Sequence, residues 1–139
     1  MATNIRPELS IKNKYHIDKH RHYELKHFCL QYPSWKQSYS EFDDASVPLS
    51  MIERVSTSNL PGDPTSKRAL MKAYYAEKMQ IIENAAREAD RYLYEYILKA
   101  VTEGLSYTYL KNKCDMPCGK DMYYDRYRRF FWLLSNSRN

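Results

Sequence analysis

The chain has 139 residues, enough for one hydrophobic core, and a formal net charge of +5 at pH 7. It has no long apolar run and no signal-peptide pattern, so we expect no transmembrane helix and a cytoplasmic protein. The sequence combines 14 tyrosines with only 3 glycines, and several stretches of helical period with no long alternating segment. This combination predicts an all-α fold.

The positive charge is concentrated at the two ends of the chain. Residues 1–27 hold six Lys and Arg against three Asp and Glu, and residues 104–139 hold seven against three. The middle, residues 28–103, holds nine against eleven. A polyanionic partner would be attracted to the ends, although a charge of this size also serves ordinary solubility.

The N-terminal part is predicted to contain a flexible basic arm, two helices and a loop. Residues 1–15 are polar and without period, which is typical of an arm, and residues 16–63 hold the helices and the loop. Asp18 can cap a helix that runs to about Tyr32, and Pro33 can begin a second helix. The first helix is expected to have a basic outer face of Lys19, Arg21, His22 and Lys26. The second is expected to dock through Trp35, Tyr39 and Phe42, before an irregular loop over 43–63.

Residues 64–139 are predicted to begin with a long helix. Asp63 is a suitable cap, Pro64 suits the first position, and the helical pattern continues to about Ala89. Its apolar stripe consists of Leu70, Met71, Tyr74, Tyr75, Lys78, Ile81, Ile82 and Ala85. A stripe of this length exceeds what a small domain needs, so part of it is expected to serve a partner or a homodimer. A further helix from Asp90 to Glu103 would end at Gly104.

The last third of the chain follows the plan of a helix-turn-helix. Ser106 can cap a short helix, which ends near Cys114, and Pro117 suits the first turn of the next helix. The core face of that longer helix is predicted to consist of Tyr123, Tyr127, Phe130 and Leu134.

This stretch resembles region 4 of the sigma-70 factors. That family's pattern is Gly-Leu-Ser-Tyr, then an apolar residue, a Leu-Gly-Ile turn and a basic recognition helix. Here Gly104-Leu-Ser-Tyr107, Leu110, Cys-Asp-Met116 and an arginine-rich tail follow it, with Asp115 in place of the turn glycine. Small phage late transcription activators of the ArpU and RinA type resemble the same region. The resemblance implies a C-terminal tri-helical helix-turn-helix unit within residues 90–135, working in a bacterial host cell.

We therefore predict a phage-type transcriptional regulator whose partner is double-stranded DNA. The residues expected to approach bases are Lys120, Tyr124 and Arg128. Those expected to contact phosphates are Lys111, Lys113, Arg126 and Arg129.

Two other interpretations stay open. The first is a phage-encoded interaction module that docks on host RNA polymerase or on a nucleic-acid-containing defence complex. The 14% aromatic content and the acidic Asp121 and Asp125 favour this alternative. The second is a structural phage component without a role in nucleic-acid binding.

No catalytic site, cofactor or metal is predicted. The sequence has no Gly-rich phosphate loop, no His-Glu-x-x-His and no Gly-x-Ser-x-Gly. Cys29, Cys114 and Cys118 are expected to be reduced, packed thiols. The alternative weighed is a zinc site that combines the Cys114-x3-Cys118 pair with N-terminal histidines.

Overall fold

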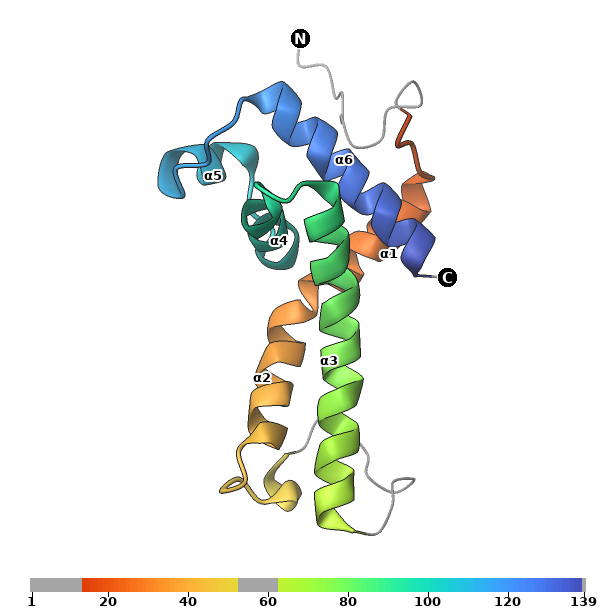
Figure 1. The fold of residues 1–139 in the computed structure, drawn as a ribbon, viewed down its shortest axis with the longest axis vertical. Coiled ribbons are helices and arrows are strands. Elements are labelled where there is room, and N and C mark those ends of the chain that lie inside the picture. The colour runs from red at the N-terminus through yellow and green to blue at the C-terminus, as the bar shows by residue number, and fades with distance from the viewer. Residues whose placement is uncertain (1–13, 53–62, 139) are drawn as a thin grey trace. The chain divides into compact units, whose positions relative to one another are not determined.

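The computed structural model describes residues 14–52 and 63–138, which contain six α-helices and no strand (Figure 1). The all-α fold and the long helix are therefore confirmed for these residues. The helices are α1 Lys19–Leu30, α2 Tyr32–Asp43, α3 Pro64–Ala89, α4 Tyr94–Glu103, α5 Tyr107–Lys113 and α6 Lys120–Ser137, with a 3-10 turn η2 at Leu49–Met51. None of the helices in the described ranges has the length and apolar character needed to cross a membrane.

The chain divides into two compact units. The first unit comprises residues 1–30 and 81–139, and the second unit comprises residues 31–80. The first unit thus contains α1, α4, α5, α6 and the end of α3, whereas the second contains α2, η2 and the beginning of α3. The sequence-based ranges 16–63 and 64–139 instead divide the chain at the end of the predicted loop. Each unit is described separately below.

The second unit is held by contacts between α2 and the first half of α3. Phe42 and Tyr75 are buried, and their rings stack with centroids 6.2 Å apart. The Arg68 guanidinium donates to the carbonyl oxygens of Phe42 and Asp44, both at 3.1 Å. The predicted docking face of α2 is therefore confirmed for Phe42, and also for Trp35, which is buried as well. The loop prediction is only partly covered, because residues 53–62 lie outside the described ranges.

Helix α3 begins as predicted, because the Asp63 carboxylate accepts the N–H of Ser66 at 3.1 Å. Its predicted stripe was too wide. Met71 is buried in the second unit, but Leu70 and Tyr74 are 48% and 49% exposed. Each residue turns the helix by about 100°, so side chains one position away from the contact face leave it.

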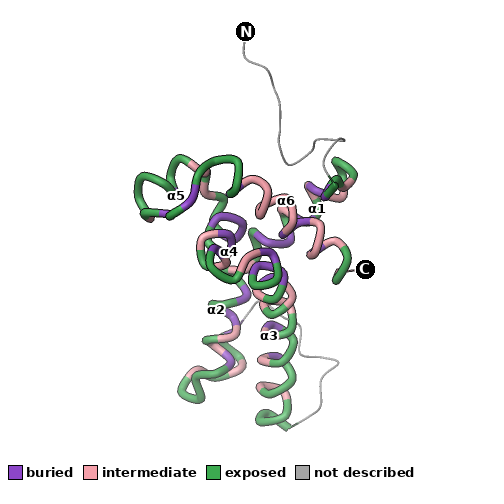
Figure 2. Tube along the Cα trace, turned by 45° about the horizontal axis from the view of Figure 1, so that its top comes forward, coloured by how far each residue is buried: buried purple, intermediate pink, exposed green. Residues whose placement is uncertain are grey.

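The core of the first unit lies where α1, α4 and α6 pack against one another (Figure 2). Its fully buried side chains include Leu25, Ile97, Phe130, Phe131 and Leu134. Two expectations fail here. His22, predicted on a basic outer face, is only 1% exposed and meets the Phe131 ring edge-on at 4.7 Å. Tyr15, assigned to the arm, is buried against Trp132; residues 1–13 of that arm lie outside the described ranges.

The position of His22 follows from helical spacing. His22, Leu25 and Cys29 recur at i, i+3 and i+7, so all three lie on the inward face of α1. The start of this helix is confirmed, since Asp18 accepts the N–H of His20 at 3.0 Å. Its end is two residues earlier than predicted, at Leu30.

Candidate nucleic-acid interface

The connection from α4 to α5 is set by two local signals. Gly104 adopts φ 70°, in the left-handed region, and ends α4. Ser106 then caps α5, because its Oγ accepts the N–H of Tyr109 at 3.1 Å. Both roles were predicted, and both are confirmed.

The turn between α5 and α6 is centred on Asp115. Asp115 has a φ of 53°, and among the described residues it is the one non-glycine residue with positive φ. It occupies the position where the sigma-70 region 4 pattern has glycine. Beyond it the N–H of Met116 bonds to the Leu110 carbonyl at 3.2 Å, and the Met116 side chain is buried. The turn therefore inserts a core residue between the helices.

The prediction that Pro117 lies in the first turn of the next helix is wrong. Helix α6 begins at Lys120, with Gly119 as its N-cap residue in an extended conformation. Met116 and Cys118 are buried on either side of the exposed Pro117. Burial at alternate positions is typical of extended backbone and not of a helix, and α6 starts only after Cys118.

We expect the Asp115 conformation to be measurable in stability. Asp115→Gly should raise the free energy of unfolding by up to about 1 kcal/mol, because glycine adopts positive φ without a Cβ clash. Asp115→Val should lower it by about 2 kcal/mol, since a β-branched residue is strained there. Urea unfolding of both variants tests this. Equal stabilities for the two variants would contradict the left-handed assignment.

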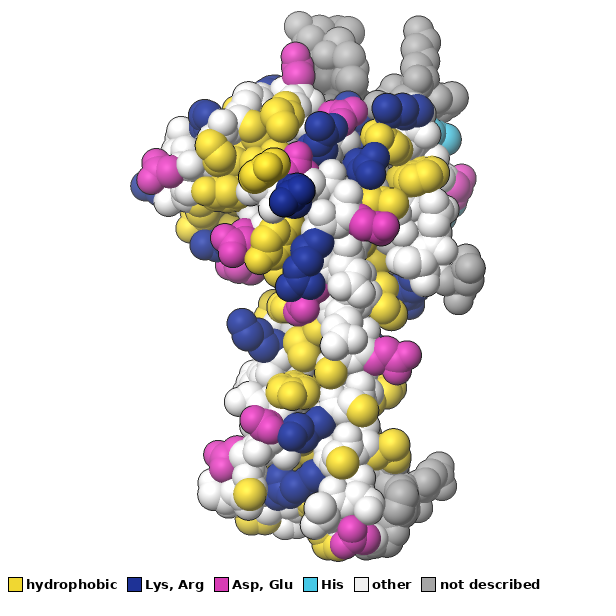
Figure 3. Space-filling model, in the orientation of Figure 1, with side chains coloured by type: hydrophobic (Ala, Val, Ile, Leu, Met, Phe, Trp, Pro, Cys, Tyr) yellow, Lys and Arg dark blue, Asp and Glu magenta, His cyan; other side chains and the backbone are white. Residues whose placement is uncertain are grey.

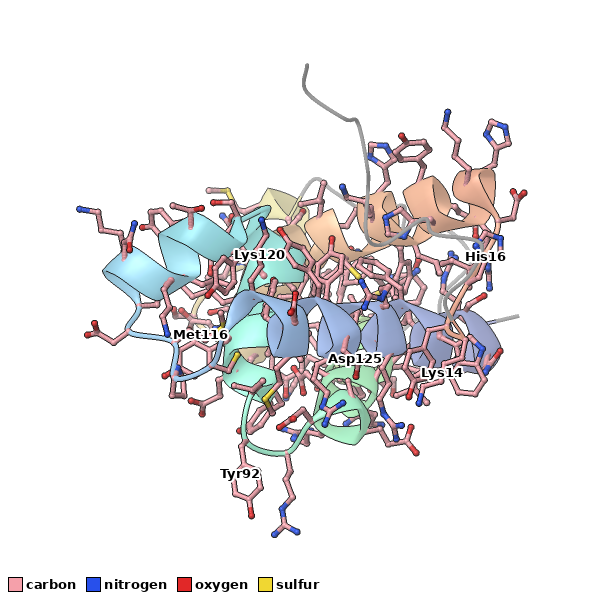
Figure 4. The ribbon with its side chains drawn as sticks, turned by 90° about the horizontal axis from the view of Figure 1, so that it is seen from above. Lys14, His16, Tyr92, Met116, Lys120 and Asp125 are labelled. Carbon is pink, nitrogen blue, oxygen red and sulfur yellow. The ribbon has the colours of Figure 1, made fainter. Side chains whose placement is uncertain are left out.

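The predicted lysines differ in their surroundings. Lys111 donates from Nζ to the Met116 and Cys118 carbonyl oxygens at 3.1 and 3.2 Å, so it braces the turn. Lys113 at the end of α5 and Lys120 at the start of α6 are exposed. Figure 4 shows Lys120 at the beginning of α6. Within the described residues, neither Lys113 nor Lys120 has an ion-pair partner.

Tyr124 belongs to a cluster of tyrosine rings. It is half-buried, and its ring lies 5.3 Å from Tyr123 and 6.2 Å from both Tyr107 and Tyr127. A small hollow of about 140 Å³ is lined by Leu105, Ser106, Tyr107, Tyr123, Tyr124 and Tyr127. Tyr124 therefore remains partly exposed to solvent within a cluster of packed aromatic rings.

Arg126 is held by two carboxylates. Its Nε donates to Asp90 at 3.0 Å and its Nη1 to Asp125 at 2.5 Å. Burial alone would raise the pKa of Asp90, but the N–H groups of Tyr92 and Leu93 and the Arg126 guanidinium together hold that pKa below its usual value. Asp90 thus closes the turn before α4 and orients Arg126.

The other two predicted arginines also lie on α6. Arg129 donates from Nε to the Glu88 carbonyl oxygen at 3.3 Å and from Nη1 to the Tyr15 hydroxyl at 3.2 Å. Arg128 is half-buried. Arg126 and Arg129 therefore join α6 to segments far away in the sequence, which no local pattern indicates.

The cysteines and histidines do not gather into a metal site in the described parts of the chain. Cys29 is buried, and burial raises the pKa of its thiol to about 12. Burial likewise raises the pKa of Cys118. These two thiols therefore remain protonated at neutral pH and pack as small apolar side chains.

Sequence reasoning missed the turn at residues 90–93. The helix predicted from Asp90 begins only at Tyr94, because Asp90 accepts the N–H groups of Tyr92 and Leu93 at 2.8 and 3.0 Å in a turn. An aspartate with these contacts is typical of a turn, so the local signal was present. Its contact with Arg126, 36 residues away, had no such signal.

Comparisons with protein-family models, with curated protein sequences and with solved structures find no match to this chain.

Proposed function

We propose that the first unit binds double-stranded DNA, with α4, α5 and α6 as a tri-helical helix-turn-helix and α6 as its recognition helix. The observation that supports this most is the arrangement at the α5–α6 turn. Leu110 and Met116 are buried while Lys113 and Lys120 are exposed on either side of the same turn. A recognition helix meets DNA through its N-terminal end, which is where Lys120 and Tyr124 lie.

The distribution of charge supports the same unit. The first unit holds 16 Lys and Arg against 11 Asp and Glu, whereas the second unit holds six of each. The whole positive excess therefore belongs to the first unit, where an attraction to phosphate groups would act.

Roles can be assigned to the seven predicted residues on this basis. Lys113 would contact phosphates, and Lys120 and Tyr124 would meet base edges. Arg128 would approach bases from the middle of α6. Lys111, Arg126 and Arg129 would hold the frame through their internal bonds and offer their remaining donors to phosphates.

The resemblance of residues 104–116 to sigma region 4 supports a role in transcription. The protein would act in the bacterial cytoplasm as a phage-type regulator. A homodimer through the second unit is part of the proposal, because the half-exposed Leu70 and Tyr74 lie on one side of α3. A dimer would bind two half-sites.

The second candidate function is docking on host RNA polymerase or another host complex. Large side chains exposed on the first unit favour it: Tyr92 is 80% exposed, Tyr109 45% and Met122 46%. Aromatic residues and methionine are enriched in protein interfaces. Binding through them would change little with salt, whereas binding led by phosphate contacts weakens steeply.

Fluorescence anisotropy with a random-sequence duplex at two salt concentrations tests the DNA proposal. We expect Lys113→Ala and Lys120→Ala each to weaken binding about tenfold at low salt and to reduce the slope of log K against log salt by about one. Lys36→Ala is the matched control, because Lys36 is exposed on the second unit, which has no net charge. If the wild type does not bind at low salt, the proposal is wrong.

A further inference from the structure

A groove of about 480 Å³ lies beside the turn that joins α3 to α4. The turn contributes Asp90, Arg91 and Tyr92, and α6 contributes Met122, Arg126 and Arg129. All of these residues belong to the first unit. Lys and Arg side chains gather on this face of the unit, among hydrophobic ones (Figure 3).

The groove has an excess of positive charge. Three arginines line it, against one acidic residue, Asp90. When the neighbouring Asp125, which binds Arg126, is included, one positive charge still remains. An anionic ligand therefore suits the groove better than a cationic or neutral one.

Two of its arginines are held in place before any ligand arrives. The internal bonds of Arg126 use its Nε and Nη1, and those of Arg129 use the same two nitrogens. Among the described residues, the Nη2 group of each has no partner. Guanidinium groups fixed in this way lose little conformational entropy when they bind an oxyanion.

The other side of the groove carries an exposed arginine and an exposed tyrosine. The Arg91 guanidinium lies 5.4 Å from the centre of the Tyr92 ring, and Tyr92 is 80% exposed. Figure 4 shows Tyr92 projecting away from the helices. Its hydroxyl can donate a hydrogen bond to a phosphate oxygen, as tyrosines do in DNA complexes.

We propose that this groove binds a phosphate group, and that the source is the backbone of the DNA that α6 reads. Arg91 and the Nη2 groups of Arg126 and Arg129 donate to the phosphate oxygens, and the Tyr92 hydroxyl adds a neutral donor. The turn before α4 would thus form a second contact with the DNA backbone, separate from the contacts of Lys113 and Lys120. The inference rests on the proposed DNA binding. It adds orientation and affinity without reading sequence.

Duplex binding by the full-length chain, measured by fluorescence anisotropy, tests the groove. Arg91→Ala should weaken binding about tenfold on every duplex sequence and reduce the salt slope by about one. Tyr92→Phe should weaken it about twofold to threefold, because only the hydroxyl is lost. Arg87→Ala is the matched control and should change affinity by less than about twofold. Arg87 also stacks on a tyrosine, 5.3 Å from the Tyr94 ring, but it does not line the groove.

The outcomes separate this inference from the proposed function. If Lys113→Ala weakens binding and Arg91→Ala does not, the groove proposal is overturned while DNA binding stands. If the wild type does not bind duplexes, the phosphate site is tested by titration with inorganic phosphate. The titration is monitored by NMR of the arginine Nε–Hε signals. Shifts at Arg126 and Arg129 that Arg91→Ala abolishes would retain the phosphate site with a free phosphate as its ligand. The absence of both responses would overturn the site and the function together.

Discussion

Replacing Phe131 with alanine is expected to lower the free energy of unfolding by about 3–5 kcal/mol, as for other large-to-small changes in cores. Phe131 is 2% exposed on α6. Its ring meets His22 of α1 at 4.7 Å and lies 4.9 and 5.0 Å from Phe130 and Tyr127. Truncation would leave a cavity where α1 and α6 pack, and these neighbours belong to helices that cannot collapse into it freely.

Urea unfolding followed by circular dichroism measures this loss. The matched control is Tyr92→Ala, which removes an aromatic ring of similar size from an exposed position and should change the free energy by less than about 0.5 kcal/mol. A loss below about 1 kcal/mol for Phe131→Ala would show that α1 and α6 do not share this core.

Replacing Asp90 with asparagine is expected to cost about 2–3 kcal/mol at neutral pH. The Asp90 side chain is 8% exposed and bonds to Arg126 at 3.0 Å. A hydrogen bond to a charged group contributes about 1.5–3 kcal/mol, whereas the capping bonds to Tyr92 and Leu93 use the other carboxylate oxygen, Oδ1, which asparagine retains. Asparagine keeps the size and one acceptor oxygen, so the loss reports mainly on the charge.

The cost should depend on pH. The pKa of Asp90 is lower in the folded protein than in the unfolded chain, whose value is about 3.9. The stabilisation by its carboxylate is therefore fully present above that value and is lost as the pH falls through the folded pKa. We expect the difference between wild type and Asp90→Asn to be constant from pH 7 to about pH 5 and to shrink below about pH 4.

Urea midpoints of both proteins at pH 7, 5, 4 and 3 measure this convergence. Because every other carboxylate is common to the two chains, their acid responses cancel in the difference. Parallel curves down to pH 3 would mean that the Asp90 charge does not stabilise the fold, and the bond to Arg126 would then have no energetic role.

Local chemistry accounts for most of the correctly predicted helix ends. Asp18, Asp63 and Ser106 each satisfy a free N–H in the first turn of the helix that follows, within three residues of sequence. Gly104 ends α4 because it adopts positive φ easily. Such interactions need no distant partner, so the sequence is sufficient to find them.

Positions that depend on packing were predicted less well. Helical period places Leu70 and Tyr74 in the stripe of α3, but α2 covers a narrower face than the stripe offers. Helix α6 starts at Lys120 and not at the predicted Pro117, because Met116 and Cys118 are buried in the segment before it. In both cases the neighbouring element decides which side chains lose their contact with water.

The sequence by itself determined the all-α fold, the capped helix ends and the concentration of charge near the C-terminus, because each follows from composition or from neighbours along the chain. Only the tertiary structure decided which cationic side chains form bonds within the fold and which remain exposed. It paired Arg126 with Asp90 across 36 residues and left Lys113 and Lys120 exposed. A charge's role depends on the groups that fold around it, and distance along the chain does not reveal those groups.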